Sequence, residues 1–265
     1  MRDAATGLSP RSIDRARGLV RDAERVVVLT GAGVSAESGV PTFRGAGGLW
    51  KEYRAEDLAT PAAFARDPRL VWEWYGWRRR LVQQCAPNAA HVALADAAAR
   101  RGGFRIVTQN VDGLHAAAAR AAAADAPAAR PLELHGSLFR TRCTQCSERR
   151  DDNDDVDATS SETLPRCTTC GALARPDIVW FGESLDAHVL SEAMRLASDA
   201  NVCLVVGTSA LVHPAAGLAD LTRRAGGAVI EVNLADTPLT NDATVALRGP
   251  AAVLVPELLA PEPVE

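Results

Sequence analysis

The sequence predicts an α/β fold in which a Rossmann-like parallel sheet carries helices on both faces. Short apolar segments such as RVVVLT (25–30) and VCLVVGT (202–208) are typical of strands that are buried on both sides. Helical stretches, including HVALADAAARR and HVLSEAMRLASDA, lie between several of these strands. This alternation indicates a parallel sheet covered on both faces. The chain has 265 residues, 47% of them hydrophobic, which is enough to bury such a core.

The predicted elements begin with a helix over residues 10–24, opened by Ser9-Pro10, and the first strand follows it directly. Further buried strands are predicted at 104–108, 131–135, 202–208, 228–233 and 252–256. The predicted nucleotide-binding domain therefore has three separate pieces. They are residues 1–44, 86–139 and 176–265.

Two segments interrupt the alternation and predict smaller modules. Residues 45–85 are rich in aromatic residues and arginine, which favours a helical module beside a cofactor loop. Residues 140–175 hold two CxxC pairs around the polar run SERRDDNDDVDATSSET, which has no capacity to form a core. This segment is predicted to be a small metal-binding insertion. The alanine-rich tract 116–129 predicts an exposed helix and loop.

Charge and the N-terminal sequence restrict the class of partner. The formal charge of -4 argues against general nucleic-acid binding. The first thirty residues are charged throughout and lack the apolar centre of a signal peptide, and no window reaches membrane-spanning length. We therefore expect a cytoplasmic protein with neither nucleic acid nor membrane as a partner. The sequence leaves the oligomeric state open, with a monomer as the working expectation.

Four of the six cysteines form two pairs, CTQC and CTTC, with twenty residues between them. Cys143, Cys146, Cys167 and Cys170 have the spacing of a tetrahedral Cys₄ zinc site. Four thiolates fill the coordination shell and leave no position for water, so the predicted role of the metal is structural. Disulfides are the alternative, which a reducing compartment disfavours. Cys85 and Cys203 are expected to be small buried hydrophobic residues.

A glycine-rich stretch, TGAGVSAESGVPTFRG (30–45), follows the first strand. In its GAGVSA segment, Gly31 permits a tight turn, Gly33 lets the backbone approach a pyrophosphate, and Ala36 allows close helix packing. Glycine turns after strands also serve packing alone, so this pattern needs support. The acidic residue expected about twenty positions later is missing, which argues against an ordinary nicotinamide dehydrogenase. The helix is cut at Gly39-Val40-Pro41, and a second glycine-rich loop that covers the dinucleotide is predicted instead.

Several motifs occur in a fixed order: GAGVSAESGVPTFR, TQNVDGLH (108–115), LELHGSL (132–138), the paired CxxC and GTS (207–209). In this order they resemble the sirtuin family of NAD-dependent protein deacylases, over residues 18–259 or so. The resemblance implies NAD as co-substrate, one structural Zn²⁺, and acylated lysine side chains of proteins as substrates. The implied products are nicotinamide, acyl-ADP-ribose and free lysine.

The resemblance also implies which residues bind NAD, and most of them follow predicted strands, whose carboxyl ends converge in a parallel sheet. The implied set is Gly31, Ala32, Gly33, Thr42, Phe43, Arg44, Gln109, Asn110, Asp112, Gly207, Thr208, Ser209, Asn233 and Ala251. Residues 31–33 would meet the pyrophosphate, 42–44 would close over the nicotinamide ribose, and 207–209 would line the adenosine side. Without the motif, Asn110 and Asp112 would be interpreted as turn or helix-cap residues.

His135 is the implied catalytic base, with Asn110 as a second catalytic residue. An imidazole titrates near neutrality, which suits a base that gains and loses a proton in one turnover. It would deprotonate a ribose hydroxyl after the amide oxygen of the acyl-lysine displaces nicotinamide. His115 is expected to be a structural partner of its loop. The remaining histidines, at positions 91, 188 and 213, are expected to be packing or surface residues.

The segment VWEWYGWRRRL (71–81) bears on the choice of acyl group. Composition alone indicates an amphipathic helix with a basic solvent face. Tyr75 and Arg78 share one helical face at i and i+3, and this YxxR is similar to the signature of the sirtuin branch that removes succinyl, malonyl and glutaryl groups. Arg78 would bind the terminal carboxylate through two charge-assisted hydrogen bonds, which predicts a preference over acetyl of about tenfold to a few hundredfold.

A strip formed by Val179, Trp180, Phe181 and Gly182 resembles the family's segment that pairs with the backbone of the substrate. Close to it, Asp177 replaces a histidine that is frequent in related sequences. Three alternatives stay open: a deacetylase, a mono-ADP-ribosyltransferase that uses the same cofactor, and a module that senses NAD without catalysis.

Overall fold

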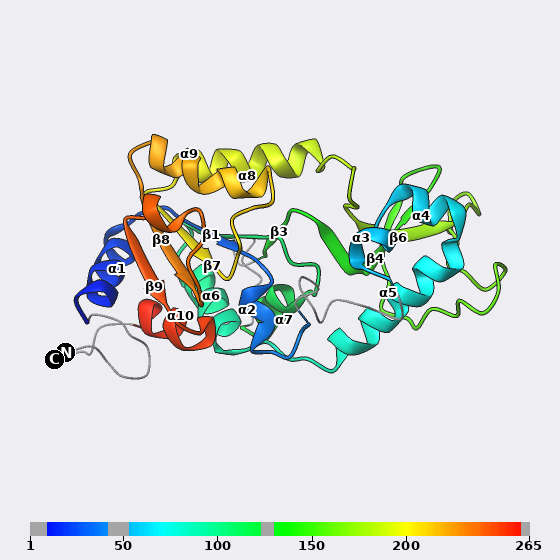
Figure 1. Ribbon diagram of the computed structural model, residues 1–265, viewed down its shortest axis with the longest axis horizontal. Helices are drawn as coiled ribbons and strands as arrows, with labels where there is room; N and C mark the ends of the chain where they lie inside the picture. Colours follow the sequence, from blue (N-terminus) through cyan, green and yellow to red (C-terminus); the bar gives the residue numbers. More distant parts are fainter. Residues whose placement is uncertain (1–9, 42–52, 123–129, 261–265) are drawn as a thin grey trace.

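The structure is a computed structural model, and it describes residues 10–41, 53–122 and 130–260. Its larger part is a six-stranded parallel sheet in the order β3-β2-β1-β7-β8-β9 (Figure 1). The strands are β1 (Val26–Thr30), β2 (Phe104–Thr108), β3 (Leu132–Glu133), β7 (Val202–Val206), β8 (Ala228–Asn233) and β9 (Val245–Arg248). Every residue of β1 and β7 is buried, which explains their unbroken apolar sequences. The predicted fold class is confirmed.

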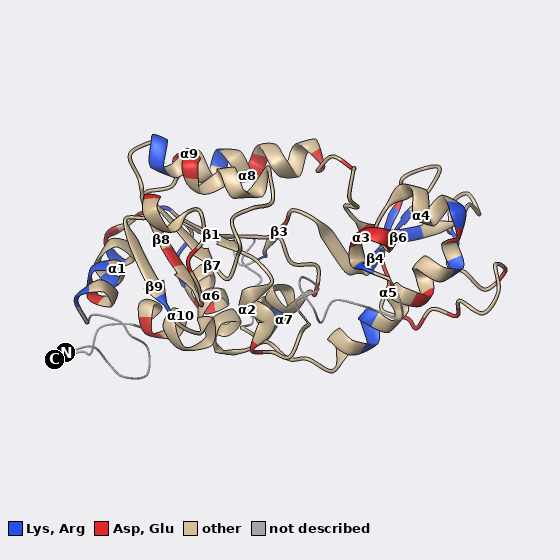
Figure 2. Ribbon diagram, in the orientation of Figure 1, with Lys and Arg blue, Asp and Glu red and all other residues tan. Residues whose placement is uncertain are grey.

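Helices cover both faces of this sheet because alternate residues of each strand point to opposite sides. Val26 and Val28 pack with helices α1 (Pro10–Asp22), α6 (Ala89–Arg100) and α10 (Ala251–Leu259). On the other face, Val27 and Leu29 pack with α8 (Ala187–Asp199) and α9 (Leu218–Arg224). Figure 2 shows charged residues on these outer helices, whereas β1 and β7 carry none.

The smaller part combines helices and a second sheet. Its three antiparallel strands have the order β5-β4-β6, with bounds β4 (Gly136–Cys143), β5 (Arg149–Asp151) and β6 (Ala174–Ile178). Its helices are α3 (Ala55–Leu58), α4 (Pro61–Arg66) and α5 (Pro68–Gln83). Buried side chains from both groups, among them Trp72, Trp74, Leu138, Ile178 and Trp180, form one hydrophobic core. The aromatic segment and the cysteine-bearing segment, which are far apart in sequence, therefore stabilise each other.

Helices α4 and α5 begin where their sequences provide caps. The hydroxyl of Thr60 accepts a hydrogen bond from the amide of Ala63 at 3.0 Å, and Asp67 accepts one from Leu70 at 3.0 Å. Each cap is followed by proline at the first helical position, where a missing amide hydrogen costs nothing. These two starts fix where α5 lies on the second sheet.

Two predicted elements differ from the structure, and one strand was not predicted. The apolar run 252–256 lies inside helix α10, because Ala251, Leu254, Val255 and Leu258 are buried at helical spacing. A short apolar run does not distinguish a strand from a buried helix, and that ambiguity caused the error. Strand β9 was not predicted, and β3 covers only Leu132–Glu133 of the predicted 131–135. None of the helices in the described ranges combines the length and apolarity needed to cross a membrane.

Candidate active site

The glycine turn after β1 lies directly against the turn after β7. The amide of Gly33 donates to the carbonyl of Gly207 at 2.7 Å, and that of Gly31 donates to Val206 at 3.1 Å. A Cβ atom on Gly33 would come within 2.7 Å of the Gly207 Cα, so no other residue fits there. These glycines therefore have a packing role, since both amides are bonded within the protein and not directed at a phosphate. They bring two strand ends together at the carboxyl edge of the sheet.

Ser35 is the centre of a buried polar cluster beneath this turn. Its hydroxyl donates to Asp112 Oδ2 at 2.7 Å and accepts from Asn110 Nδ2 at 3.0 Å. His91 Nε2 lies 3.3 Å from the same hydroxyl oxygen. All four side chains are buried. Ser35 and His91 were not identified from the sequence as site residues. The position of Ser35 inside the GAGVSA motif could have indicated its role, whereas no motif surrounds His91.

Asp112 also caps the next helix. Its Oδ1 accepts a hydrogen bond from the amide of Leu114 at 2.9 Å, at the start of α7 (Leu114–Ala121). The helix-cap interpretation of Asp112 is therefore correct for one carboxylate oxygen, while the other oxygen belongs to the polar cluster. Each carboxylate oxygen has two lone pairs, so neither contact uses up its capacity to accept.

His91 and His115 pack ring against ring behind this cluster, with centroids 4.7 Å apart. His115 Nε2 lies 2.9 Å from the Thr30 hydroxyl, so its partner is the first strand and not its own loop. Burial lowers the pKa of His91 to about 4. Burial, with a smaller contribution from the charge of His91, lowers the pKa of His115 to about 3. Both rings are therefore neutral near pH 7, and His91 is more than the ordinary packing residue we expected.

His135 follows β3 and is oriented by the segment after β2. Its Nδ1 lies 2.9 Å from the carbonyl oxygen of Gln109. A carbonyl only accepts, so Nδ1 carries the hydrogen and, in the neutral ring, Nε2 carries the lone pair. This tautomer is the one required of a general base that acts through Nε2.

Predicted cofactor residues from three strand ends meet at Thr208. Gln109 Nε2 donates to the Thr208 hydroxyl at 3.0 Å, and Asn233 Nδ2 donates to the Thr208 carbonyl at 2.8 Å. Residues after β2, β7 and β8 are thus hydrogen bonded to one another. Ser209 lies in the same loop as Thr208 and is partly buried.

Ala251, the last predicted adenine contact, lies at the start of helix α10. Ala251 is buried at the first turn of α10, and the amide of the next residue, Ala252, donates to Glu37 Oε2 at 2.8 Å. This contact holds α10 against the end of the glycine-rich segment that contains Ala32. Thr42, Phe43 and Arg44 lie outside the described residues.

On helix α5, Tyr75 is buried and Arg78 is partly buried. The guanidinium carbon of Arg78 lies 4.9 Å from the ring centroid of Trp74 and 5.5 Å from that of Tyr75. Burial lowers the pKa of Arg78, and the carboxylate of Asp112 offsets part of this shift. Arg78 therefore lies within electrostatic reach of the polar cluster. A basic solvent face on α5 was the alternative that composition indicated. It holds for the exposed Arg80, but Arg78 is partly buried and Arg79 is buried.

The strip that begins at Val179 runs between the two parts of the molecule. Its Val179 amide donates to the carbonyl of His135 at 3.0 Å, and its Phe181 amide donates to Ala59 at 2.9 Å. The Trp180 amide donates to Glu183 Oε2 at 2.9 Å. Three amides of the strip are thus bonded inside the protein. A peptide that pairs here has to donate its own amides to carbonyl oxygens of the strip.

The four paired cysteines converge on one point. Cys143 Sγ lies 3.4 Å from Cys170 Sγ, and Cys146 Sγ lies 3.5 Å from Cys167 Sγ. A tetrahedral zinc ion with bonds of about 2.3 Å requires sulfur–sulfur edges of about 3.8 Å, close to these separations. All six cysteines of the chain are free thiols. The cluster fits a structural zinc, and it lies at the far end of β4, the strand that starts directly after His135.

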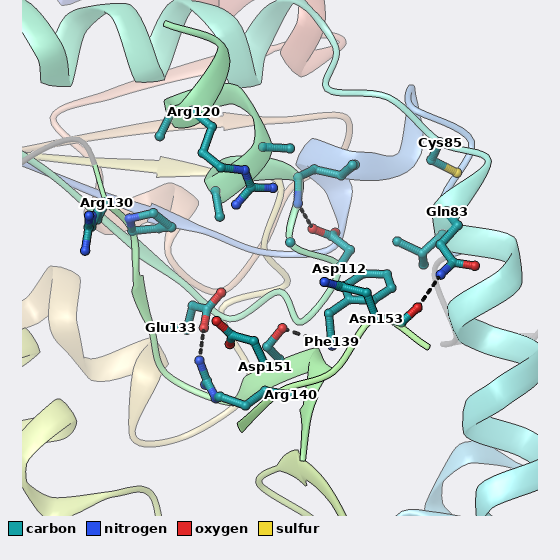
Figure 3. Close-up of a pocket in the computed structure, with 18 residues that line it drawn as sticks. Gln83, Cys85, Asp112, Arg120, Arg130, Glu133, Phe139, Arg140, Asp151 and Asn153 are labelled. Carbon is teal, nitrogen blue, oxygen red and sulfur yellow. Dashed lines mark hydrogen bonds and ion pairs between the residues drawn. The ribbon is translucent and has the colours of Figure 1, made fainter. Parts of the chain in front are cut away.

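A cavity of about 1010 Å³ opens between α7, β4 and the end of α5 (Figure 3). Arg140 NH1 and Glu133 Oε2 form an ion pair of 3.2 Å at its edge. Of the predicted cofactor residues that the structure describes, Asp112 alone lines this cavity. Gln109, Thr208 and Asn233, which meet at the strand ends, therefore do not line this cavity.

Comparison with known proteins agrees with this geometry. The family model described as the Sir2 family matches residues 31–214. The chain is 47% identical over 235 residues to an NAD-dependent protein deacylase of Pyrococcus furiosus, covering 88% of this chain and 91% of that protein. It is 44% identical over 268 residues to the mitochondrial NAD-dependent protein deacylase sirtuin-5 of Canis lupus familiaris, covering 92% and 84%. A crystal structure of a Sir2 homologue in complex with NAD superposes with a TM-score of 0.83 at 45% identity, covering 93% and 92%.

Proposed function

The chain belongs to the Sir2 family and is an NAD-dependent protein deacylase, and we propose that it prefers lysine acyl groups that end in a carboxylate, namely succinyl, malonyl and glutaryl. The observation that carries this proposal is the pair formed by Tyr75 and Arg78 on helix α5. Tyr75 is fully buried, and Arg78 is partly buried against two aromatic rings. A cation in such surroundings favours an anionic ligand.

The argument is electrostatic. Burial lowers the pKa of Arg78, which means that the charged guanidinium loses hydration in the folded protein. The carboxylate of a succinyl group returns charge-assisted hydrogen bonds, each worth about 1.5 to 3 kcal/mol. An acetyl group offers no charge in return. The expected difference in kcat/KM is about tenfold to a few hundredfold in favour of the acidic acyl groups.

We assign the general base to His135. When bound, NAD supplies the ribose carbon that receives the acyl oxygen and releases nicotinamide. The Gln109 carbonyl holds the His135 ring by Nδ1, so Nε2 is the atom that takes a proton from a ribose hydroxyl. Gln109 is itself fixed by Thr208, which supports the assignment of Gln109 to the nicotinamide and ribose contacts.

Asn110 and Asp112, held by Ser35, form our proposed pocket for the nicotinamide carboxamide. Asp112 still has lone pairs with which to accept from an amide, and burial strengthens such a bond. The turns at 31–33 and 207–209, together with Asn233 and Ala251, are assigned to the pyrophosphate and adenosine. The contact between Gly33 and Gly207 supports this, because it brings the two turns together at the edge where strand ends converge.

Acylated lysines of proteins are the proposed substrates, and the strip 179–182 is the proposed docking segment. Phe181 is 51% exposed beside the buried Trp180, so one side chain of the strip is directed to solvent. Backbone pairing through carbonyl oxygens would tolerate many peptide sequences. A reducing compartment such as the cytoplasm, which keeps the four zinc thiolates reduced, is part of the proposal.

Replacing Arg78 by methionine tests the acyl preference. Arg78→Met should abolish the preference for succinyl-lysine over acetyl-lysine peptides, measured as nicotinamide release, while the KM for NAD changes little. Arg80→Met is the matched control, because Arg80 is on the same helix but exposed. Desuccinylation that is unchanged in Arg78→Met would refute the assignment.

A further inference from the structure

Trp180 differs from its neighbours in the docking strip. It is 2% exposed, whereas Phe181 beside it is 51% exposed. Its indole Nε1 donates to the hydroxyl of Tyr75 at 2.9 Å, although the two residues are 105 positions apart in the chain.

The indole ring is held on several sides. The guanidinium carbon of Arg175 lies 3.3 Å from its ring centroid, and the ring of Phe64 lies 5.3 Å away. Arg175 forms two hydrogen bonds to Glu183, of 2.6 and 2.8 Å, and Glu183 accepts from the Trp180 amide. This closed set of contacts fixes the direction of the indole N–H.

The bond to Tyr75 has a chemical consequence. An indole N–H only donates, so the Tyr75 oxygen accepts from it. The indole thus bonds the Tyr75 hydroxyl through its oxygen. The hydroxyl keeps its own hydrogen for donation to another group. A carboxylate, which only accepts, is the complementary partner for a hydroxyl committed to donation.

We propose that Trp180 is a positioning residue for acyl recognition, because it commits the Tyr75 hydroxyl to donate its hydrogen to the carboxylate of the acyl group. The inference rests on the proposed preference for acidic acyl groups. Arg175 and Glu183 contribute by holding the indole in place. Trp180 acts through Tyr75 and touches neither the peptide nor the acyl chain.

The test compares Trp180→Phe with wild type on succinyl-lysine and acetyl-lysine peptides at saturating NAD. Phenylalanine keeps an aromatic ring but removes the N–H donor. One neutral hydrogen bond is worth about 1 kcal/mol, so the ratio of kcat/KM for succinyl over acetyl should fall about fivefold, mainly through KM for the succinyl peptide. Tyr75→Phe should lower the same ratio, and the double variant should lose less than the sum of the two single losses in free energy.

Trp72→Phe is the matched control. Trp72 is a similarly buried tryptophan of the same core, and its single N–H donates to the Ala174 carbonyl at 3.0 Å and not to Tyr75. It should leave the ratio unchanged, whatever it does to stability. A wild-type ratio well above one that stays unchanged in Trp180→Phe would overturn this inference alone. A wild-type ratio near one would overturn the proposed acyl preference, and the inference with it.

Discussion

The amide of Val179 donates to the carbonyl oxygen of His135 at 3.0 Å, so the proposed base and the proposed docking strip are bonded to each other. The next residue, Trp180, donates to Tyr75 on helix α5. One turn further along that helix lies Arg78. A short path of backbone and hydrogen bonds thus joins the imidazole of position 135 to the guanidinium of position 78. This continuity supports the view that both groups serve one site.

Removing the imidazole should stop the reaction without unfolding the protein. His135→Ala should lower kcat by about 10²- to 10⁴-fold, the usual contribution of a positioned base. The zinc content and circular dichroism should match wild type, since His135 lies between β3 and β4, outside the zinc cluster and the hydrophobic cores. His188→Ala, at an exposed position on α8, is the control. Turnover of His135→Ala within a few-fold of wild type would show that another group is the base.

The hydroxyl of Ser35 should matter for NAD more than for the peptide. Ser35→Ala leaves the buried Asp112 carboxylate and the Asn110 amide without a shared partner, at a cost of about 1 to 3 kcal/mol. We expect kcat/KM for NAD to fall about five- to one-hundredfold. Ser38→Ala is the control, because the buried Ser38 hydroxyl has no hydrogen-bond partner among the described residues. Equal effects of the two substitutions would contradict the role of the cluster.

The buried histidines predict that acid destabilises the protein. Their folded pKa values, about 4 for His91 and about 3 for His115, lie below the ordinary value of 6.5. The unfolded chain therefore binds more protons than the folded protein once the pH falls below 6.5. The free energy of unfolding should be highest above pH 6.5 and should decrease from there down to about pH 3, by up to about 1.4 kcal/mol per pH unit for each ring.

Urea unfolding at pH 7.5 and pH 5.0 measures this dependence. His115→Gln retains a polar side chain that does not titrate, so the difference between the two pH values should shrink by about half. His188→Gln, at the exposed histidine of α8, should leave the difference as it is in wild type. Equal stability of the wild type at both pH values would refute the neutral buried pair.

Zinc removal should act on catalysis through structure. Strand β4 runs from Gly136, directly after His135, to Cys143 in the metal cluster. Chelation should increase amide hydrogen exchange across β4, β5 and β6 and should abolish turnover, while β1 and β7 stay protected. Cys170→Ser should behave in the same way. Full turnover after complete removal of the metal would contradict the structural assignment.

Local motifs were the most predictable part of this protein. The four paired cysteines meet in one cluster, and their spacing alone limits the chemistry. The roles of His135 and of the glycines at 31 and 33 were predicted from a family resemblance and stay predictions. The parallel sheet was equally accessible, because β1 and β7 are apolar throughout. The predicted strand at residues 252–256 was wrong, because an apolar pattern of this length suits a strand and a buried helix alike.

Contacts between segments that are far apart in the chain could not be predicted from the sequence. Ser35 meets Asp112 across 77 positions, and Arg79, which looked like part of a solvent face, is buried with its Nε bonded to the Leu138 carbonyl at 2.7 Å. The proposed role of Trp180 likewise depends on a partner 105 positions away, Tyr75 on helix α5. Such pairs form only when the fold brings the segments together, and no local pattern announces them.

The most direct measurement of the central claim is nicotinamide release by the wild-type protein from acetyl-, succinyl- and malonyl-lysine peptides, each with and without NAD. We predict NAD-dependent release with all three peptides and a kcat/KM for succinyl- or malonyl-lysine at least about tenfold above that for acetyl-lysine. Release that is equal for the three peptides, or highest for acetyl-lysine, would contradict the account of Arg78 and Tyr75.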